Sequence, residues 1–347
     1  MTSECKIKVS KLGFPWATLD PFLFCVYHED AYPKGNAALG PDASLGGRAL
    51  GQDFAGKDGW RMYHGQTVPG FPAHPHRGFE TVTIVRSGYI DHSDSLGAAA
   101  RFGRGDVQWL TAGQGVVHSE MFPLLNASAP NPLELFQIWL NLPRRSKMAP
   151  PYFTMFWAED IPRQAIPDSD GLNTEVTYIA GHRGTMAGAN LRPPPPPDSW
   201  ASDPDADLAI WNIEMAAGAS WTLPPAVTSE ARRTLYFYKG ADLVLDNQRI
   251  PVSSAIEVIS RQPVVLINGA VPSELLLLQG KPIGEPVAQR GPFVMNTDQE
   301  LRQAYSDYQR THFGGWPWPD EAPVHAAREG RFARHADGQL ETPPRDG

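Results

Sequence analysis

Two short segments place metal-binding types of side chain at a spacing that puts them on one face of a β-strand. His74 and His76 stand two positions apart in FPAHPHRGFETV, and His118 and Glu120 do so in GQGVVHSEM. Residues i and i+2 of a strand project from the same face, so each pair can converge on one ion. Three imidazoles and one carboxylate suit Fe, Mn, Co, Ni, Cu or Zn and suit Mg or Ca poorly. We therefore expect one divalent transition metal, with the ligands His74, His76, His118 and Glu120.

Ordinary buried histidines are the alternative interpretation, and the polar residues nearby have alternatives of their own. Glu80 could be a fifth ligand or accept a histidine N–H, or it could hydrogen-bond to a neighbouring strand or to Arg77. His92 and Asp94 also alternate, but they follow a turn, and a solvated hairpin is the better interpretation. His64 is a weak candidate for lining the mouth of a pocket.

The overall composition limits the class of protein. The chain has 347 residues, which exceeds the usual length of one domain and predicts two. Its net charge of −8 argues against direct binding to nucleic acid or to an anionic membrane surface. No apolar run is long enough for a membrane helix, and the N-terminal residues lack the apolar core of a signal peptide. We expect a cytoplasmic protein without a disulfide framework, because only two cysteines occur.

The elements that must position the four ligands are predicted to be strands. Short runs rich in Val, Ile, Thr and aromatic residues, separated by Gly and Pro turns, predict an all-β chain. The first predicted domain spans residues 12–150 and includes a long Gly-rich loop at 28–72. The segment RPPPPPDSWASDPDAD, residues 192–207, cannot form a regular element, because proline lacks a backbone donor and fixes φ. It separates the two halves, and the second predicted domain spans 173–312.

One helix is predicted near the end of the chain, over residues 297–310, and we assign it to the second domain. Thr297 and Glu300 form a capping box, and apolar residues then recur at helical spacing. The remaining tail, 313–347, is rich in Pro, Gly and charge. We expect this tail to be loosely packed or disordered.

The loop at 28–72 leads directly into the segment that carries His74 and His76. Long loops in compact domains are often lids or binding loops. We expect part of this loop to cover the mouth of the first barrel and to restrict which substrate enters, with side chains of residues 53–72 approaching the open side of the metal. The alternative is that the loop packs against the outside of the barrel or against a second subunit.

These motifs resemble the pirin family of the cupin superfamily. HPHRGFETV, GRGDVQWLTAGQGVVHSEM and FQIWLNLP are similar to the N-terminal cupin of pirins, and EPVAQRGPFVMNT to their C-terminal signature. The resemblance implies a bicupin, in which two double-stranded β-helix barrels face each other and only the N-terminal one holds metal. It also implies the same four metal ligands. The long loop, the proline segment and the extended tail depart from the family pattern.

The resemblance implies two alternative functions. One is a dioxygenase that opens a flavonol such as quercetin with O₂ at a mononuclear site, with Fe(II) as the first expectation for the metal and Glu120 as the catalytic base. The substrates are then a small aromatic molecule and O₂. The other is a non-enzymatic metal-binding regulator whose partner is a transcription factor or a metabolic enzyme. A metal-dependent isomerase or hydrolase stays open as well, because a fold does not fix the chemistry.

Overall fold

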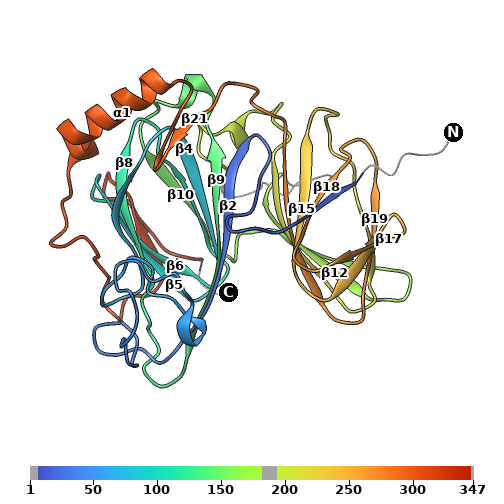
Figure 1. Ribbon diagram of the computed structural model, residues 1–347, viewed down its shortest axis with the longest axis horizontal. Coiled ribbons are helices and arrows are strands. Elements are labelled where there is room, and N and C mark those ends of the chain that lie inside the picture. Colours follow the sequence, from blue (N-terminus) through green and yellow to red (C-terminus); the bar gives the residue numbers. More distant parts are fainter. Residues whose placement is uncertain (1–6, 182–193, 345–347) are drawn as a thin grey trace. The chain divides into compact units, whose positions relative to one another are not determined.

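The structure is a computed structural model that describes residues 7–181 and 194–344. Within these ranges it consists of β-strands with a single α-helix near the C-terminal end (Figure 1). The all-β prediction with a short C-terminal helix is confirmed. The described chain divides into two compact units. We call residues 26–160 and 285–347 the N-terminal barrel, and residues 161–284 with those up to Cys25 the C-terminal barrel.

The N-terminal barrel consists of two larger sheets and a short hairpin. One sheet has the strand order β10-β7-β4-β9-β2, the other has the order β24-β23-β6-β5-β8-β3, and β21 pairs with β22. The elements are β2 (Phe22–Tyr32), η1 (Lys57–Gly59), β3 (Gly70–His76), β4 (Phe79–Ser87), β5 (Tyr89–Asp94), β6 (Ala99–Gly103), β7 (Val107–Thr111), β8 (Val116–Met121), β9 (Asn131–Asn141), η2 (Arg144–Ser146), β10 (Tyr152–Phe156), β21 (Ala288–Arg290), β22 (Phe293–Met295), α1 (Asp298–Thr311), η4 (His312–Gly314), β23 (Phe332–Arg334) and β24 (Leu340–Glu341).

The C-terminal barrel also has two sheets, with the orders β1-β18-β15-β20-β13-β12-β11 and β14-β19-β16-β17. Its interior is a closely packed apolar core that includes Trp211, Leu235 and Leu277. The elements are β1 (Lys8–Lys11), β11 (Arg163–Pro167), β12 (Asn173–Ala180), η3 (Trp200–Ser202), β13 (Ala209–Met215), β14 (Ser220–Leu223), β15 (Arg232–Lys239), β16 (Asp242–Leu245), β17 (Gln248–Pro251), β18 (Ser254–Val258), β19 (Val264–Asn268) and β20 (Ser273–Gly280).

The division of the chain differs from the predicted boundaries of 12–150 and 173–312. The chain passes from the C-terminal to the N-terminal barrel within β2, and it returns to the N-terminal barrel at Glu285. Helix α1 therefore belongs to the N-terminal barrel, where Leu301 and Ala304 pack with Val117 and Phe293. Figure 1 shows α1 across one end of this barrel, near β8 and β21. The apolar face of the helix finds its partner there, and sequence order alone does not reveal that partner.

The predicted capping box is present at the start of α1. The Thr297 side chain accepts a hydrogen bond from the Glu300 backbone N–H, and the Glu300 carboxylate accepts one from Asn296 N–H. Two backbone donors that the helix leaves free are thus satisfied. The helix begins at Asp298 and ends at Thr311, within one residue of the prediction.

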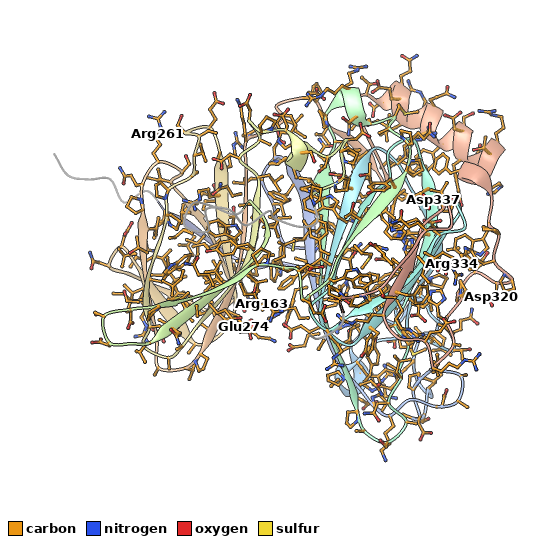
Figure 2. All side chains as sticks on the ribbon, turned by 180° about the vertical axis from the view of Figure 1, so that it is seen from behind. Arg163, Arg261, Glu274, Asp320, Arg334 and Asp337 are labelled. Atoms are coloured by element: carbon orange, nitrogen blue, oxygen red, sulfur yellow. The ribbon has the colours of Figure 1, made fainter. Side chains whose placement is uncertain are left out.

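The tail is ordered along residues 316–344, which corrects the expectation of a loosely packed or disordered segment. Strand β23 pairs with β6 and continues one sheet of the N-terminal barrel. Figure 2 shows Arg334 and Asp337 of the tail against this barrel. Arg101, fully buried on β6, donates hydrogen bonds to the backbone carbonyls of His325, Ala326 and Glu329. Backbone pairing of this kind does not depend on an apolar sequence, so composition failed to predict it.

The long loop is shorter than predicted and packs into the barrel. Strand β2 continues to Tyr32 and β3 begins at Gly70, so the irregular segment lies between them and holds only η1. Trp60, Met62 and Tyr63 are buried in the core of the N-terminal barrel. Of the proline segment, residues 192 and 193 lie outside the described residues, and the described remainder contains only η3.

Candidate metal centre

Three histidines meet where β3 and β8 pair. The strands are antiparallel, His74 lies opposite His118, and a register shift between Phe71 and His74 re-aims the end of β3. Gly70 (φ +132°) lets the two strands approach, because a Cβ there would lie 2.4 Å from the Glu120 carbonyl oxygen. One nitrogen of each of the three imidazoles lies within 4.8 Å of the others. The three imidazoles thus lie on one face of the paired strands, as the spacing of the histidines predicts.

The imidazole nitrogens of this cluster are suited to a metal ion. The Nδ1–H of His74 donates to the Pro72 carbonyl at 2.8 Å, which leaves its Nε2 lone pair free. Nδ1 of His76 and both nitrogens of His118 are buried without a hydrogen-bond partner in the described part of the chain. Unpaired buried polar atoms are costly, so a buried nitrogen without a partner on both rings points to a missing group that one nitrogen of each ring would bind. A divalent transition metal fits this donor set.

Burial also fixes the charge state of the cluster. Desolvation lowers the pKa of His74 to about 4 and holds the pKa of His76 and of His118 well below the ordinary value. The three imidazoles are therefore neutral at pH 7, which is the form that binds a metal.

Glu120 lies beside the three histidines. Its Oε2 is 3.9 Å from His118 Nε2, although it falls outside the group whose ligand atoms all lie within 4.8 Å of one another. The carboxylate accepts hydrogen bonds from Thr83 (3.3 Å) and Gln137 (3.4 Å) of the opposite sheet. Burial raises the pKa of Glu120 to about 7. The carboxyl group can therefore gain or lose a proton near neutral pH.

His92 and Asp94 lie next to this cluster, which makes the predicted solvated hairpin wrong. Both side chains are buried, His92 Nε2 is 3.3 Å from Asp94 Oδ2, and the His92 ring centroid is 5.5 Å from that of His118. In the register of β5 and β8, His92 lies opposite Glu120 and Asp94 opposite His118. The i, i+2 spacing that identified the ligands also occurs here. In the sequence alone, no second pair faces it.

Glu80 does not join the cluster. β3 ends at His76 and a new strand begins at Phe79, so Glu80 does not continue the strand face that carries His74 and His76. Thr83 faces the cluster through Glu120, and Glu80, three residues earlier on β4, points to the other face of the sheet. There its carboxylate accepts a hydrogen bond from Thr111 of the neighbouring strand at 2.7 Å. This is one of the alternatives left open by the sequence.

Aromatic side chains flank the cluster on two sides. The rings of Phe79 and Trp139 lie 5.1 and 5.3 Å from the ring of His76. Phe71 lies 6.4 Å from His74 and 5.7 Å from His64 of the irregular segment. His64 of the irregular segment therefore reaches the cluster through Phe71 of β3. Whether residues 53–72 restrict substrate entry stays a prediction.

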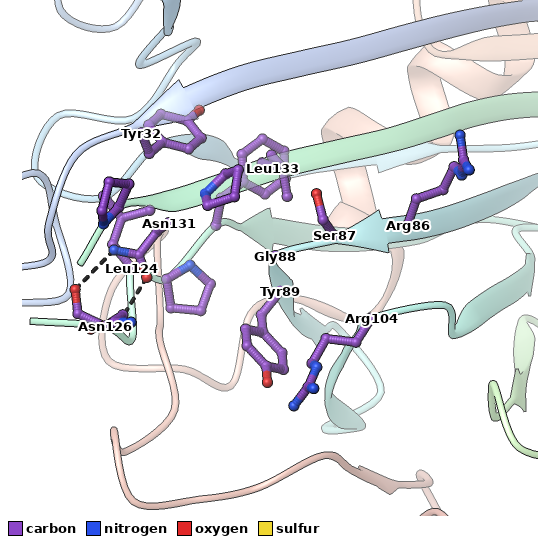
Figure 3. Close-up of a pocket in the computed structure, with 14 residues that line it drawn as sticks. Tyr32, Arg86, Ser87, Gly88, Tyr89, Arg104, Leu124, Asn126, Asn131 and Leu133 are labelled. Carbon is purple, nitrogen blue, oxygen red and sulfur yellow. Dashed lines mark hydrogen bonds between the residues drawn. The ribbon is translucent and has the colours of Figure 1, made fainter. Parts of the chain in front are cut away.

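A separate pocket of about 470 Å³ lies between the turn that joins β4 to β5 and the segment that leads into β9 (Figure 3). Tyr89, Arg104 and Leu133 line it, and none of its lining residues is a histidine of the cluster. Elsewhere in the described residues, no second group of three or more His, Cys, Asp or Glu side chains is arranged for a metal. Nor does the described chain contain a helix with the length and apolarity to cross a membrane.

Comparison with known proteins gives matches over both barrels. Residues 52–140 match the family model described as Pirin, and residues 210–314 match that of the Pirin C-terminal cupin domain. The chain is 36% identical over 244 residues to a pirin-like protein of Caulobacter vibrioides, covering 70% of this chain and 80% of that one. It is 32% identical over 259 residues to mouse (Mus musculus) pirin, with coverage of 73% and 80%.

A solved structure shows the same fold. The quercetin 2,3-dioxygenase from Acinetobacter baumannii aligns with a TM-score of 0.64 at 27% identity, over 85% of this chain and 86% of that one. The fold with two cupin domains is therefore confirmed.

Proposed function

The chain belongs to the pirin family, and from that premise we propose that it is a metal-dependent dioxygenase that opens a flavonol such as quercetin with O₂. The observation that supports this most is the cluster of three neutral imidazoles, two of them buried and that of His74 half-buried, with an ionisable carboxyl group beside it. The likeness to a solved quercetin 2,3-dioxygenase supports the choice of substrate class.

We assign His74, His76, His118 and Glu120 as the ligands of one mononuclear centre. Fe(II) is the ion we propose, and Mn, Co, Ni, Cu or Zn would suit the same donor set. When bound, the metal would supply a Lewis acid for a phenolic oxygen and a route for electrons between an aromatic substrate and O₂. The His74 Nδ1–H donated to the Pro72 carbonyl fixes the ring orientation that such a centre needs.

Glu120 is the residue to which we assign proton transfer. A base works best when its pKa is close to the working pH, and in the protein without metal burial raises that of Glu120 to about 7. Thr83 and Gln137 hold the carboxylate in place by hydrogen bonds, so it can take the proton of a flavonol 3-hydroxyl without losing its orientation. Phe79 and Trp139 provide apolar surface beside His76 that would exclude water and pack against a planar ring.

The test is turnover of quercetin by the Fe(II)-loaded protein under ¹⁸O₂, with the product analysed by mass spectrometry. We expect loss of quercetin, dependent on O₂, and a ring-opened product that carries two labelled oxygen atoms. The His76→Ala protein, treated in the same way, should show neither. A wild-type protein that holds metal at full occupancy and leaves quercetin unchanged would refute the proposed dioxygenase.

A further inference from the structure

The wall that faces the metal cluster can be derived from the register of four strands. Thr83 of β4 touches Glu120, so Thr83 points into the barrel. Residues directly opposite one another on antiparallel strands share a face. Gln108 of β7 and Gln137 of β9 both lie opposite Thr83, and so they point inward in the same row.

The next row of the same wall lies two residues along each strand. Thr81 of β4 stands opposite Leu110 of β7 and Trp139 of β9. The contact between Trp139 and His76 confirms that this row also faces the cluster. Strand β10 pairs with the edge of β7 that is away from β4, and there Met155 lies opposite Gln108 and Phe153 opposite Leu110. The wall thus combines apolar side chains with a small number of polar ones.

Two polar side chains of this wall have no hydrogen-bond partner in the described structure. Both the Oε1 and Nε2 atoms of Gln108 are buried and unpaired, and so is the Oγ1 atom of Thr81. The polar neighbours of Gln108 in its row do have partners, because Thr83 and Gln137 form hydrogen bonds with each other and with Glu120. A buried amide with both ends unpaired is rare in folded proteins, which makes a bound group the simplest explanation.

We propose that Gln108 and Thr81 form a polar subsite beside the metal centre that receives a ring hydroxyl of a polyhydroxylated aromatic substrate. A phenolic hydroxyl both donates and accepts a hydrogen bond, which matches the carbonyl oxygen and the amide N–H of one glutamine. The flanking Leu110, Met155 and Phe153 suit the planar carbon skeleton. This proposal rests on the proposed function, and it specifies which flavonols the centre selects.

The experiment compares two ligands that differ only in ring hydroxyls. Quercetin and 3-hydroxyflavone share the 3-hydroxyl that reacts, but 3-hydroxyflavone has no hydroxyls on its other rings. Binding to the Fe(II)-loaded protein is measured without O₂ by fluorescence titration, and metal content is measured in each sample. We expect wild type to prefer quercetin by about tenfold or more, since one hydrogen bond changes affinity by roughly this factor.

Gln108→Leu should abolish that preference and leave the affinity for 3-hydroxyflavone nearly unchanged. It should also leave the melting temperature equal or higher, because it removes an unpaired buried amide. The matched control is Gln279→Leu in the C-terminal barrel. Gln279 is equally buried but donates to Asp207 twice, so its loss should lower the melting temperature and leave the preference intact. A merely structural role for Gln108 would instead give both variants the same outcome.

Thr81→Val, which is close to isosteric, provides a second variant if Gln108→Leu fails to fold, and it should reduce the preference in the same direction. An unchanged preference in a folded Gln108→Leu or Thr81→Val protein would overturn the subsite, as would a wild type that binds both flavonols equally or neither. Selective binding without turnover under O₂ would refute the proposed reaction and leave the subsite standing.

Discussion

The candidate metal centre depends on the charge state of a few buried groups. Burial keeps the three imidazoles neutral, whereas the same burial raises the pKa of the Glu120 carboxyl to about 7. An ion needs the imidazoles in the neutral form and the carboxyl in the charged form. The two requirements are met together only above a certain pH, and Glu120 sets that limit.

Metal affinity should therefore fall as the pH drops below about 7. In that range Glu120 carries a proton that the ion must displace, while His74, with a pKa of about 4, stays neutral. Linkage then predicts a loss of roughly tenfold in affinity per pH unit between about pH 7 and 5. Competition titrations with Co(II) at several pH values measure this slope, and Glu120→Gln should show a flat profile. An affinity of the wild type that does not change with pH would contradict the role of Glu120 as a ligand.

Replacing Glu120 by Gln should separate binding from proton transfer. The amide keeps the shape of the side chain and an acceptor oxygen, so we expect weaker but measurable metal binding. Turnover of quercetin at full metal occupancy should drop by about 10²–10⁴-fold, the usual contribution of a general base. Steady-state rates on metal-saturated protein give the answer. An unaltered rate would mean that Glu120 only packs against Thr83 and Gln137.

Sequence spacing was sufficient for the histidines of the centre and insufficient for their surroundings. His74, His76 and His118 follow from strand parity, because β3 and β8 are adjacent and regular at these residues. His92 and Asp94 obey the same parity on β5, but the adjacency of β5 to β8 is a property of the folded sheet. Gln108 could not be found from spacing at all, because its position depends on the register of β7 with β4.

At the scale of elements, a buried ion pair between two strands of the N-terminal barrel, β6 and β5, helps to hold the tail in place. Arg101 binds both oxygens of Asp91 at 2.7 Å, and both side chains are fully buried. Asp91 also accepts a hydrogen bond from the His325 backbone N–H, and Trp318 donates to the Asp94 carbonyl. These contacts reach β5, the strand that carries His92. The tail therefore stabilises the sheet that holds the metal cluster.

Arg101→Met should be strongly destabilising. It leaves the Asp91 carboxylate buried without its charge partner and removes the donors to three tail carbonyls. Breaking a buried ion pair on one side typically costs about 3–5 kcal/mol. Denaturant unfolding measures the difference, and the exposed Arg334→Gln on the same tail should stay within about 0.5 kcal/mol of wild type. Equal stability of the two variants would show that the tail contributes nothing through Arg101.

The cap of α1 gives a smaller prediction of the same kind. Thr297→Ala removes the acceptor for the Glu300 backbone N–H and should lower the free energy of unfolding by about 1 kcal/mol. Ser306→Ala, at an exposed position in the middle of α1, is the matched control and should be neutral or slightly stabilising. Urea unfolding curves distinguish the two, and identical curves would show that the cap has no energetic role.

Elements with local signals were predictable, and elements that depend on distant partners were not. The helix was found from Thr297 and Glu300 because a capping box is read within one turn. The packing of α1 against the N-terminal barrel, and the ordered tail, escaped prediction for one cause. Helix α1 packs against β8 as well as against the preceding β22, and β23 pairs with β6. Strands β8 and β6 come much earlier in the chain, and no local pattern encodes such a pairing.

At the scale of the whole molecule, the two cupin barrels of this chain differ in the side chains that fill their interiors. The N-terminal barrel contains the histidine cluster within its interior, whereas the matching interior of the C-terminal barrel is an apolar core. Among the described residues the cluster is the single arrangement suited to a metal. We therefore expect one metal ion per chain, located in the N-terminal barrel.

Native mass spectrometry of the protein loaded with metal tests this claim most directly, since it counts ions bound to each intact chain. We predict one ion per chain for wild type, none for His76→Ala, and one for His312→Asn, which alters an exposed histidine outside the cluster. Two ions on the wild-type chain, or an ion retained at full occupancy by His76→Ala, would contradict the account.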